Sequence, residues 1–106
     1  MNFSVVYLPE ASGDVDEAID WLRERAPLAA SDFLRAIARA EVHLRYMPLI
    51  YQVVRRDIRR VHLKPFRYGL YFRVVDDRVI VIACQHTSRS PRAIARTLSL
   101  RRRPPG

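Results

Sequence analysis

The sequence has little cysteine and no long hydrophobic segment. Its single cysteine, Cys84, cannot form a disulfide within the chain, which excludes the small disulfide-stabilised scaffolds of secreted proteins. The longest uninterrupted apolar run, from Val79 to Cys84, is far shorter than the roughly 20 residues that a membrane-spanning helix needs. The N-terminus also lacks a basic segment followed by an apolar stretch, so no secretory signal is visible. We therefore expect a cytoplasmic protein without a membrane partner, in which Cys84 is a small buried strand residue.

The chain is too short for two domains. Its 106 residues can bury a single core, and its 49% hydrophobic and 28% charged residues are typical of a globular protein. Only the C-terminal end is biased in composition, with consecutive arginines, prolines and glycine. We expect one domain over residues 1–98, followed by a basic, disordered tail over residues 99–106.

Acidic residues are scarce in the second half of the chain. Residues 1–54 carry 5 Arg against 8 Asp and Glu, a net charge of −3, whereas residues 55–106 carry 14 Lys and Arg against 3 Asp, a net charge of +11. All but one of these cations, Lys64, are arginines. Because the planar guanidinium group suits phosphate and carboxylate groups, the composition indicates a nucleic acid or an acidic protein segment as partner.

The first half predicts one strand and two helices. Residues 2–8 are rich in β-branched and aromatic residues and predict a strand. Asp14, followed by an acidic residue three positions later, fits the N-cap of a helix that ends near Ala26. Pro27 is favourable only in the first turn of a new helix, so a second helix is expected over residues 28–47. Two amphipathic helices joined this tightly form an antiparallel hairpin.

Three apolar residues lie beside the main hydrophobic stripe of the second helix. Leu34, Ala38 and Val42 are spaced by four and therefore share one side of the helix. They fit either the flank of a broad core face or a groove for a partner segment.

The second half predicts strands followed by a short helix. Residues 49–57 give no clear pattern and are expected to form an irregular connection, and residues 58–63 alternate as a strand does. Residues 79–85 are apolar on both faces, which predicts a central strand with the N-terminal strand beside it. After Ser90-Pro91 a short helix is expected over residues 92–98.

Residues 67–75 alternate most clearly. One set of side chains is expected to cover the helices: Tyr68, Leu70, Phe72 and Val74. The other set is expected to face outward: Arg67, Gly69, Tyr71 and Arg73. The sequence therefore predicts an α+β fold of order β-α-α-β-β-β, with a helical hairpin on one face of a small, mostly antiparallel sheet and basic residues on the other.

An ordered set of motifs connects this pattern with a known superfamily. The motifs are Arg67-Tyr68, Phe72-Arg73-Val74, the Asp76-Asp77 hairpin, the apolar strand 79–84 and His86-Thr87-Ser88-Arg89-Ser90-Pro91. In this order they resemble the RelE/ParE superfamily, the toxins of bacterial type II toxin–antitoxin systems, over residues 7–91. The resemblance implies a cognate antitoxin as partner, and no cofactor or metal.

The two branches of the superfamily differ in their target. RelE-type members are ribosome-dependent messenger-RNA endonucleases, which need a base, an acid and a cation near the scissile phosphate. Gly69, Thr87 and Ala93 stand where these nucleases carry functional side chains. A rearranged nuclease site of Lys64, Arg73 and His86 stays open as an alternative. His86 also fits a structural role, in which it bonds backbone at the strand end and orders the turn before Arg89.

ParE-type members, by contrast, bind DNA gyrase and need no catalytic group of their own. The resemblance therefore favours a ParE-like toxin that poisons gyrase; a plain nucleic-acid-binding module is a third possibility on charge alone. The residues expected to bind the target are Arg60, Lys64, Arg67, Arg73, His86, Arg89 and Arg92. Those expected to bind the antitoxin are Leu34, Ala38, Val42 and Arg73.

Overall fold

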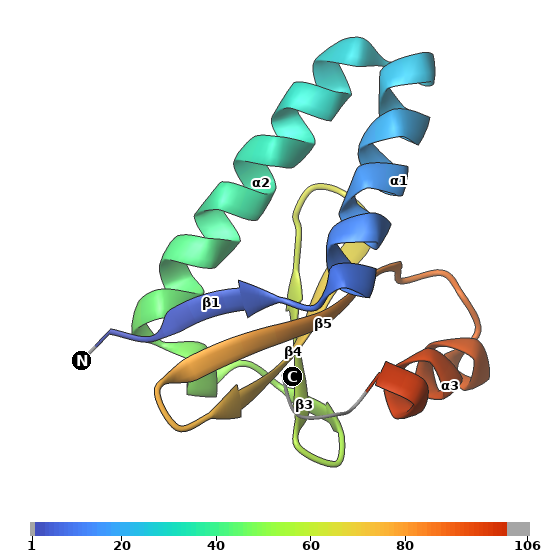
Figure 1. Cartoon of the computed structure of the whole chain (residues 1–106). Helices are drawn as coiled ribbons and strands as arrows, with labels where there is room; N and C mark the ends of the chain where they lie inside the picture. The colour runs from blue at the N-terminus through green and yellow to red at the C-terminus, as the bar shows by residue number, and fades with distance from the viewer. Residues whose placement is uncertain (1, 102–106) are drawn as a thin grey trace.

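A computed structural model describes residues 2–101. Its elements are β1 (Ser4–Tyr7), α1 (Pro9–Arg25), α2 (Pro27–Tyr46), the 3₁₀ turn η1 (Pro48–Ile50), β2 (Val53–Arg55), β3 (Ile58–His62), β4 (Tyr68–Val75), β5 (Arg78–His86) and α3 (Pro91–Arg101). The five strands form one sheet in the order β1-β5-β4-β3-β2, in which β1 is parallel to β5 and the other pairs are antiparallel. The α1–α2 hairpin rises from the sheet, and α3 lies away from the hairpin (Figure 1). The predicted α+β class is confirmed.

The helical hairpin is built around Pro27. The C-cap N–H of Ala26 still bonds to the carbonyl oxygen of Leu22 at 2.6 Å, and α2 then starts with proline at its first turn, as expected. Small and large buried side chains alternate on the two helices, which lets them pack closely on the sheet; they include Ala18 and Leu22 on α1, and Phe33, Ile37, Ala40 and Leu44 on α2. Within residues 2–101, no helix has both the length and the apolarity to cross a membrane.

The start of α1 differs from the prediction. The helix begins at Pro9, whose fixed φ suits the first turn, and Leu8 in an extended conformation is the N-cap. Gly13 does not break the helix, because a single glycine costs a helix only about 1 kcal/mol relative to alanine. Asp14 is therefore not an N-cap, and its carboxylate is free to contact another element.

The irregular connection expected over residues 49–57 contains a further strand. After η1, the short strand β2 pairs with β3, with Val53 opposite Arg59 and Arg55 opposite Ile58. The turn between them places Arg56 at φ 55°, a left-handed conformation that closes a tight hairpin. Three residues are too few to show an alternating pattern, which is why the sequence did not indicate β2.

The face of the sheet away from the hairpin is not simply an open basic surface. Tyr71, expected to face outward, is 1% exposed. It lines a hollow together with Ile94 and Leu98 of α3, so this helix covers it. Helix α3 is also longer than predicted and continues to Arg101, so residues 99–101 are not a tail; residues 102–106 lie outside the described part of the chain. The central position of β5, with β1 beside it, and the burial of Cys84 are confirmed.

Candidate functional site

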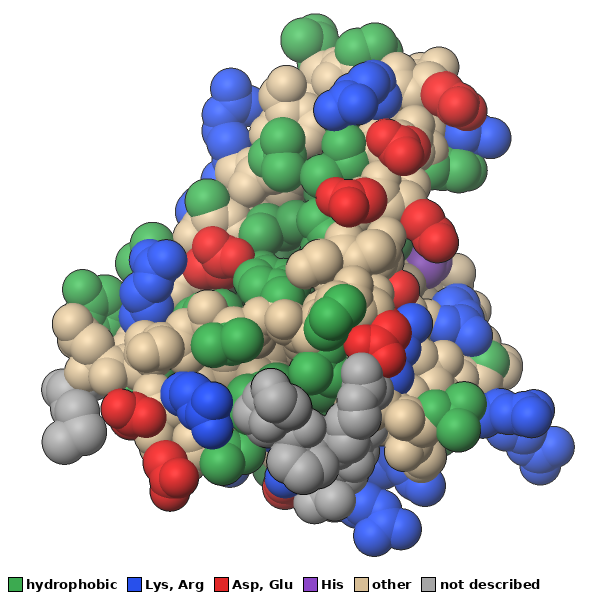
Figure 2. Space-filling view, viewed as in Figure 1, with side chains coloured by type: hydrophobic (Ala, Val, Ile, Leu, Met, Phe, Trp, Pro, Cys, Tyr) green, Lys and Arg blue, Asp and Glu red, His purple; other side chains and the backbone are tan. Residues whose placement is uncertain are grey.

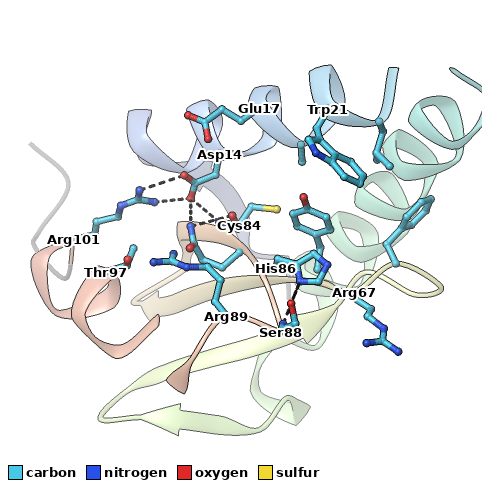
Figure 3. A pocket seen from close by; sticks show the side chains of 15 residues that line it. Asp14, Glu17, Trp21, Arg67, Cys84, His86, Ser88, Arg89, Thr97 and Arg101 are labelled. Atoms are coloured by element: carbon cyan, nitrogen blue, oxygen red, sulfur yellow. Dashed lines mark hydrogen bonds and ion pairs between the residues drawn. The ribbon is translucent and has the colours of Figure 1, made fainter. Parts of the chain in front are cut away.

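A large open cleft lies where β5 ends. It has a volume of about 1050 Å³ and separates α1 from the segment that links β5 to α3. One wall carries Asp14, Glu17 and Trp21 of α1, and the other carries Arg67 and Arg89 (Figure 3). The walls therefore have opposite charge, and the acidic wall also carries the half-exposed indole of Trp21.

The charge of the two helices explains this polarity. Helix α1 contains six acidic residues and two arginines, whereas α3 contains three arginines and no acidic residue. Acidic side chains follow α1 and Lys and Arg side chains surround α3 (Figure 2). A partner entering the cleft meets a cationic side and an anionic side at once.

Asp14 connects the two walls beneath the cleft. Its Oδ2 accepts hydrogen bonds from the backbone N–H of Cys84 and from the side-chain amide of Gln85, each at 3.0 Å. Arg101 donates Nη1 to Oδ2 at 2.6 Å and Nη2 to Oδ1 at 3.2 Å, and its Nη1 also reaches the carbonyl oxygen of Ile82. The Asp14 and Arg101 side chains are only 12% and 20% exposed. This bidentate pair joins α1, β5 and the C-terminal end of α3.

His86 organises the turn after β5. The N–H of Ser88 donates to Nδ1 of His86 at 3.2 Å, and the Ser88 hydroxyl lies 2.5 Å from the same nitrogen. Because a backbone N–H can only donate, Nδ1 is the acceptor and a neutral ring carries its proton on Nε2. The N–H of Arg89 bonds to the carbonyl oxygen of His86 at 3.1 Å. The structural role expected of His86 is confirmed, since the ring holds the turn that presents Arg89.

An aromatic cluster supports His86 from the hairpin side. Phe33 of α2 contacts the rings of Phe66 and Tyr68 edge-on, each at 5.2 Å between centroids. Tyr68 in turn meets the His86 imidazole at 5.1 Å. Phe33 is fully buried, so α2 fixes the start of β4, and through Tyr68 it fixes the end of β5.

A second, smaller hollow lies beneath α3. It has a volume of about 330 Å³, and its polar side is formed by Arg55, Arg60, Tyr71, Thr87 and Arg89. Its other side is the apolar face of α3, with Pro91, Ile94, Ala95 and Leu98, together with Val54. Basic residues and an apolar helix thus face each other across this hollow.

The side chain of Arg60 lies over Gly69, where a larger residue would carry its own side chain. A Cβ added to Gly69 would lie 3.1 Å from both Cγ and Cδ of Arg60. The stem of Arg60 therefore lies across the position of Gly69. Arg60 reaches the same face of the sheet from β3.

The three residues of the alternative nuclease site are not gathered. Arg73 lies five residues along β4 from Tyr68, the partner of His86, which corresponds to roughly 16 Å of strand. Its Nε bonds to Oδ2 of Asp57 at 3.0 Å. Lys64 is exposed in the loop before β4, at the His86 end. Arg73 is thus held at the opposite end of the strand from the other two.

The remaining expected cations lie around the end of β5 and α3. Arg67 and Arg89 line the open cleft, Arg60 and Arg89 line the hollow, and Arg92 is exposed in the first turn of α3. The sequence did not single out Arg55, which donates to the hydroxyl of Ser99 at 3.2 Å and so ties β2 to α3. It gave no signal for that contact, because 44 residues separate the pair.

The apolar stripe of α2 is exposed. Leu34 and Val42 are 47% and 46% accessible and Ala38 is exposed, so these residues are not the flank of the core. Tyr46, 57% exposed, extends the stripe by one more step of four. Further exposed apolar residues follow α2 along the chain, at its C-cap, in η1 and in β2: Met47, Leu49, Ile50 and Val53.

Two titratable groups are shifted by their surroundings. Burial, with a smaller effect of Asp14, raises the pKa of the Cys84 thiol to about 12, so Cys84 is not a nucleophile at neutral pH. Burial, with the charges of Arg60 and Lys64, lowers the pKa of His62, which keeps this histidine neutral. In the described part of the chain, no group of His, Cys, Asp and Glu side chains could hold a metal ion.

Comparisons with known proteins agree with this architecture. The family model described as the ParE toxin of the type II toxin–antitoxin system, parDE, matches residues 5–91. Among solved structures, the chain is similar to one described as the chromosomal ParDE TA system from P. aeruginosa, with a TM-score of 0.71 and 16% identity. The similarity covers 81% of this chain and 97% of that chain. No curated protein sequence matches.

Proposed function

Because this chain belongs to the ParE toxin family of type II toxin–antitoxin systems, we propose that it inhibits growth by binding DNA gyrase and that a cognate antitoxin neutralises it. The family match over residues 5–91 carries the proposal. The site supports it, since Gly69, Thr87 and Ala93 offer no nuclease groups and Arg73 is held far from His86. The protein then acts by binding, with the basic cleft wall as its contact surface.

We expect the target-binding surface to centre on Arg67 and Arg89. Both are exposed and line the open cleft, and Arg89 is presented by the turn that His86 orders. Guanidinium groups at this position suit a carboxylate or a phosphate of a gyrase–DNA complex. Arg60, Lys64 and Arg92 extend the same basic region.

Removing Arg67 and Arg89 together should strongly weaken inhibition of gyrase. The test adds the purified Arg67→Ala/Arg89→Ala variant to a supercoiling and DNA-cleavage assay, where we expect at least about a tenfold loss of potency. The Arg35→Ala/Arg39→Ala variant of exposed arginines on α2 removes the same charge elsewhere and should keep full potency. Equal potency of both variants would contradict the proposed surface.

A second assay, on translating ribosomes, tests the alternative that the chain is a messenger-RNA endonuclease. The unmodified chain and its His86→Ala and Arg73→Ala variants are added to a translating system that is read by primer extension. Codon-specific cuts that disappear in His86→Ala or Arg73→Ala, together with unaffected gyrase, would establish the endonuclease activity instead.

We propose that the antitoxin binds the exposed stripe of α2. Leu34, Ala38, Val42 and Tyr46 offer a continuous apolar track, and the positive second half of the chain attracts an acidic partner. An antitoxin segment that is disordered when free would fold on binding and bury its apolar residues along this stripe.

Acidic residues in this stripe should prevent neutralisation. The Leu34→Glu/Val42→Glu variant is expected to remain toxic when the adjacent antitoxin gene is coexpressed, because buried carboxylates have no partner in the groove and repel an acidic segment. The matched control is Leu28→Glu, at a position that is 83% exposed near the start of α2 and should still be neutralised. Rescue of the double variant to normal growth would exclude this surface.

A further inference from the structure

The hydroxyl of Tyr71 is buried without a hydrogen-bond partner in the part of the chain that the structure describes. The side chain is 1% exposed, so water does not satisfy the group from the surface. A buried hydroxyl without a partner destabilises a fold, so its presence in a native structure needs an explanation, and a ligand that supplies the missing partner is one. Tyr71 lines the hollow beneath α3, which indicates where that ligand would bind.

The polar side of this hollow is cationic. Arg55, Arg60 and Arg89 contribute to it, and no acidic side chain occurs among its described lining residues. Arg55 is bonded to the Ser99 hydroxyl, and within residues 2–101 neither Arg60 nor Arg89 forms an ion pair. Two guanidinium groups are therefore available for an anion, beside a phenol that can donate to one of its oxygens.

The opposite side is apolar. Ile94 and Leu98 of α3, one helical turn apart, form this wall with Pro91 and Ala95. A ligand that matches both sides has an anionic group attached to a flat apolar body, which is the chemistry of a nucleotide. A bare phosphate would leave the apolar wall without a contact.

We propose that this hollow binds a nucleotide. The phosphate lies between Arg60 and Arg89, the Tyr71 hydroxyl donates to a phosphate or sugar oxygen, and the base packs on Ile94 and Leu98. Arg60 gives access to the hydroxyl: its stem lies beside Gly69, opposite Tyr71 across β3 and β4, and a flexible side chain there can swing aside. The hollow shares Arg60 and Arg89 with the proposed gyrase-binding surface. Its test uses the chain alone, without gyrase or antitoxin, so the site stands or falls separately from the proposed function.

The test uses the purified full chain alone, at low salt, in calorimetric titrations. Adenosine 5′-monophosphate should bind saturably and at least about tenfold more tightly than adenosine or inorganic phosphate. Tyr71→Phe and Arg60→Gln should each weaken it by about tenfold or more, because each removes a hydrogen-bond donor to the bound nucleotide. Tyr46→Phe and Arg39→Gln, at exposed positions of α2, should bind as the unmodified chain does.

Tyr71→Phe also separates binding from folding. It removes a hydroxyl that is unsatisfied in the free protein, so the melting temperature should not fall while affinity does. A short oligoadenylate shows whether the natural ligand is a free nucleotide or part of a nucleic-acid strand. Tighter binding of the oligoadenylate than of adenosine 5′-monophosphate assigns a strand, and no binding of the oligoadenylate assigns a free nucleotide. Unchanged affinity in Tyr71→Phe, inorganic phosphate binding as tightly as the nucleotide, or no saturable binding would each overturn the site.

Discussion

Replacing Asp14 with alanine should lower the free energy of unfolding by about 3–5 kcal/mol. The substitution leaves Arg101 with no carboxylate in a position where its side chain is only 20% exposed. It also removes the acceptor for the Cys84 N–H and the Gln85 amide. Both effects leave buried polar groups without partners, which lowers the free energy of unfolding. The expected decrease is a large part of the total stability of a small domain.

Denaturant unfolding of three variants tests this effect. Asp16→Ala, two residues away on the exposed side of α1, should stay within about 0.5 kcal/mol of the unmodified chain. Asp14→Ala/Arg101→Met should be more stable than Asp14→Ala alone, because the unpaired guanidinium is removed as well. If Asp14→Ala behaves like Asp16→Ala, the contact does not hold α3 in place.

The same variant bears on the proposed sites. Arg101 forms the link between the C-terminal end of α3 and α1, and α3 is one wall of the hollow that contains Tyr71. Loss of the link should therefore loosen the hollow as well as lower stability. Hydrogen exchange of the α3 amides would report this local opening separately from global unfolding.

The order of elements followed from local patterns, and the long-range contacts did not. Proline positions and periodicity placed the end of α1, both ends of α2 and both ends of β5 within about one residue of their observed bounds, whereas α1 starts at Pro9, ahead of its predicted start. Asp14 was interpreted as an N-cap because its neighbours in sequence fit one, whereas its real partners are 70 to 87 residues away. No local signal distinguishes these two roles of an aspartate.

The outward face of β4 is a second case in which local sequence patterns did not reveal a long-range contact. Alternation correctly put Tyr71 and Leu70 on opposite faces, yet it carries no information about whether a later helix covers the outer one. One signal was present: Ile94 and Leu98 form an apolar pair on α3 that needs a surface to pack on, and Tyr71 on the outward face of β4 provides it. Arg73 and His86 were chosen from their charge and from the motifs of the resemblance, neither of which gives a distance, so they were grouped although the length of the strand separates them.

Replacing Phe33 with alanine should cost about 3–5 kcal/mol of stability. Its ring is fully buried and packs edge-on against Phe66 and Tyr68, so truncation leaves a cavity between α2 and the start of β4 that rigid strands cannot fill. Leu34→Ala, at the next position and 47% exposed, should cost less than about 1 kcal/mol in the same denaturant titration.

The effect of Phe33 should extend to the cleft through Tyr68. Because Tyr68 contacts the His86 ring, the milder Phe33→Leu variant should shift the NMR signals of His86 and Ser88 while the protein stays folded. A double-mutant cycle of Phe33→Leu with Tyr68→Leu should give a coupling of about 0.5–1.5 kcal/mol. A coupling near zero, with an unchanged His86 signal, would mean that α2 does not position the turn that carries Arg89, and the cleft would then depend on α1 and α3 alone.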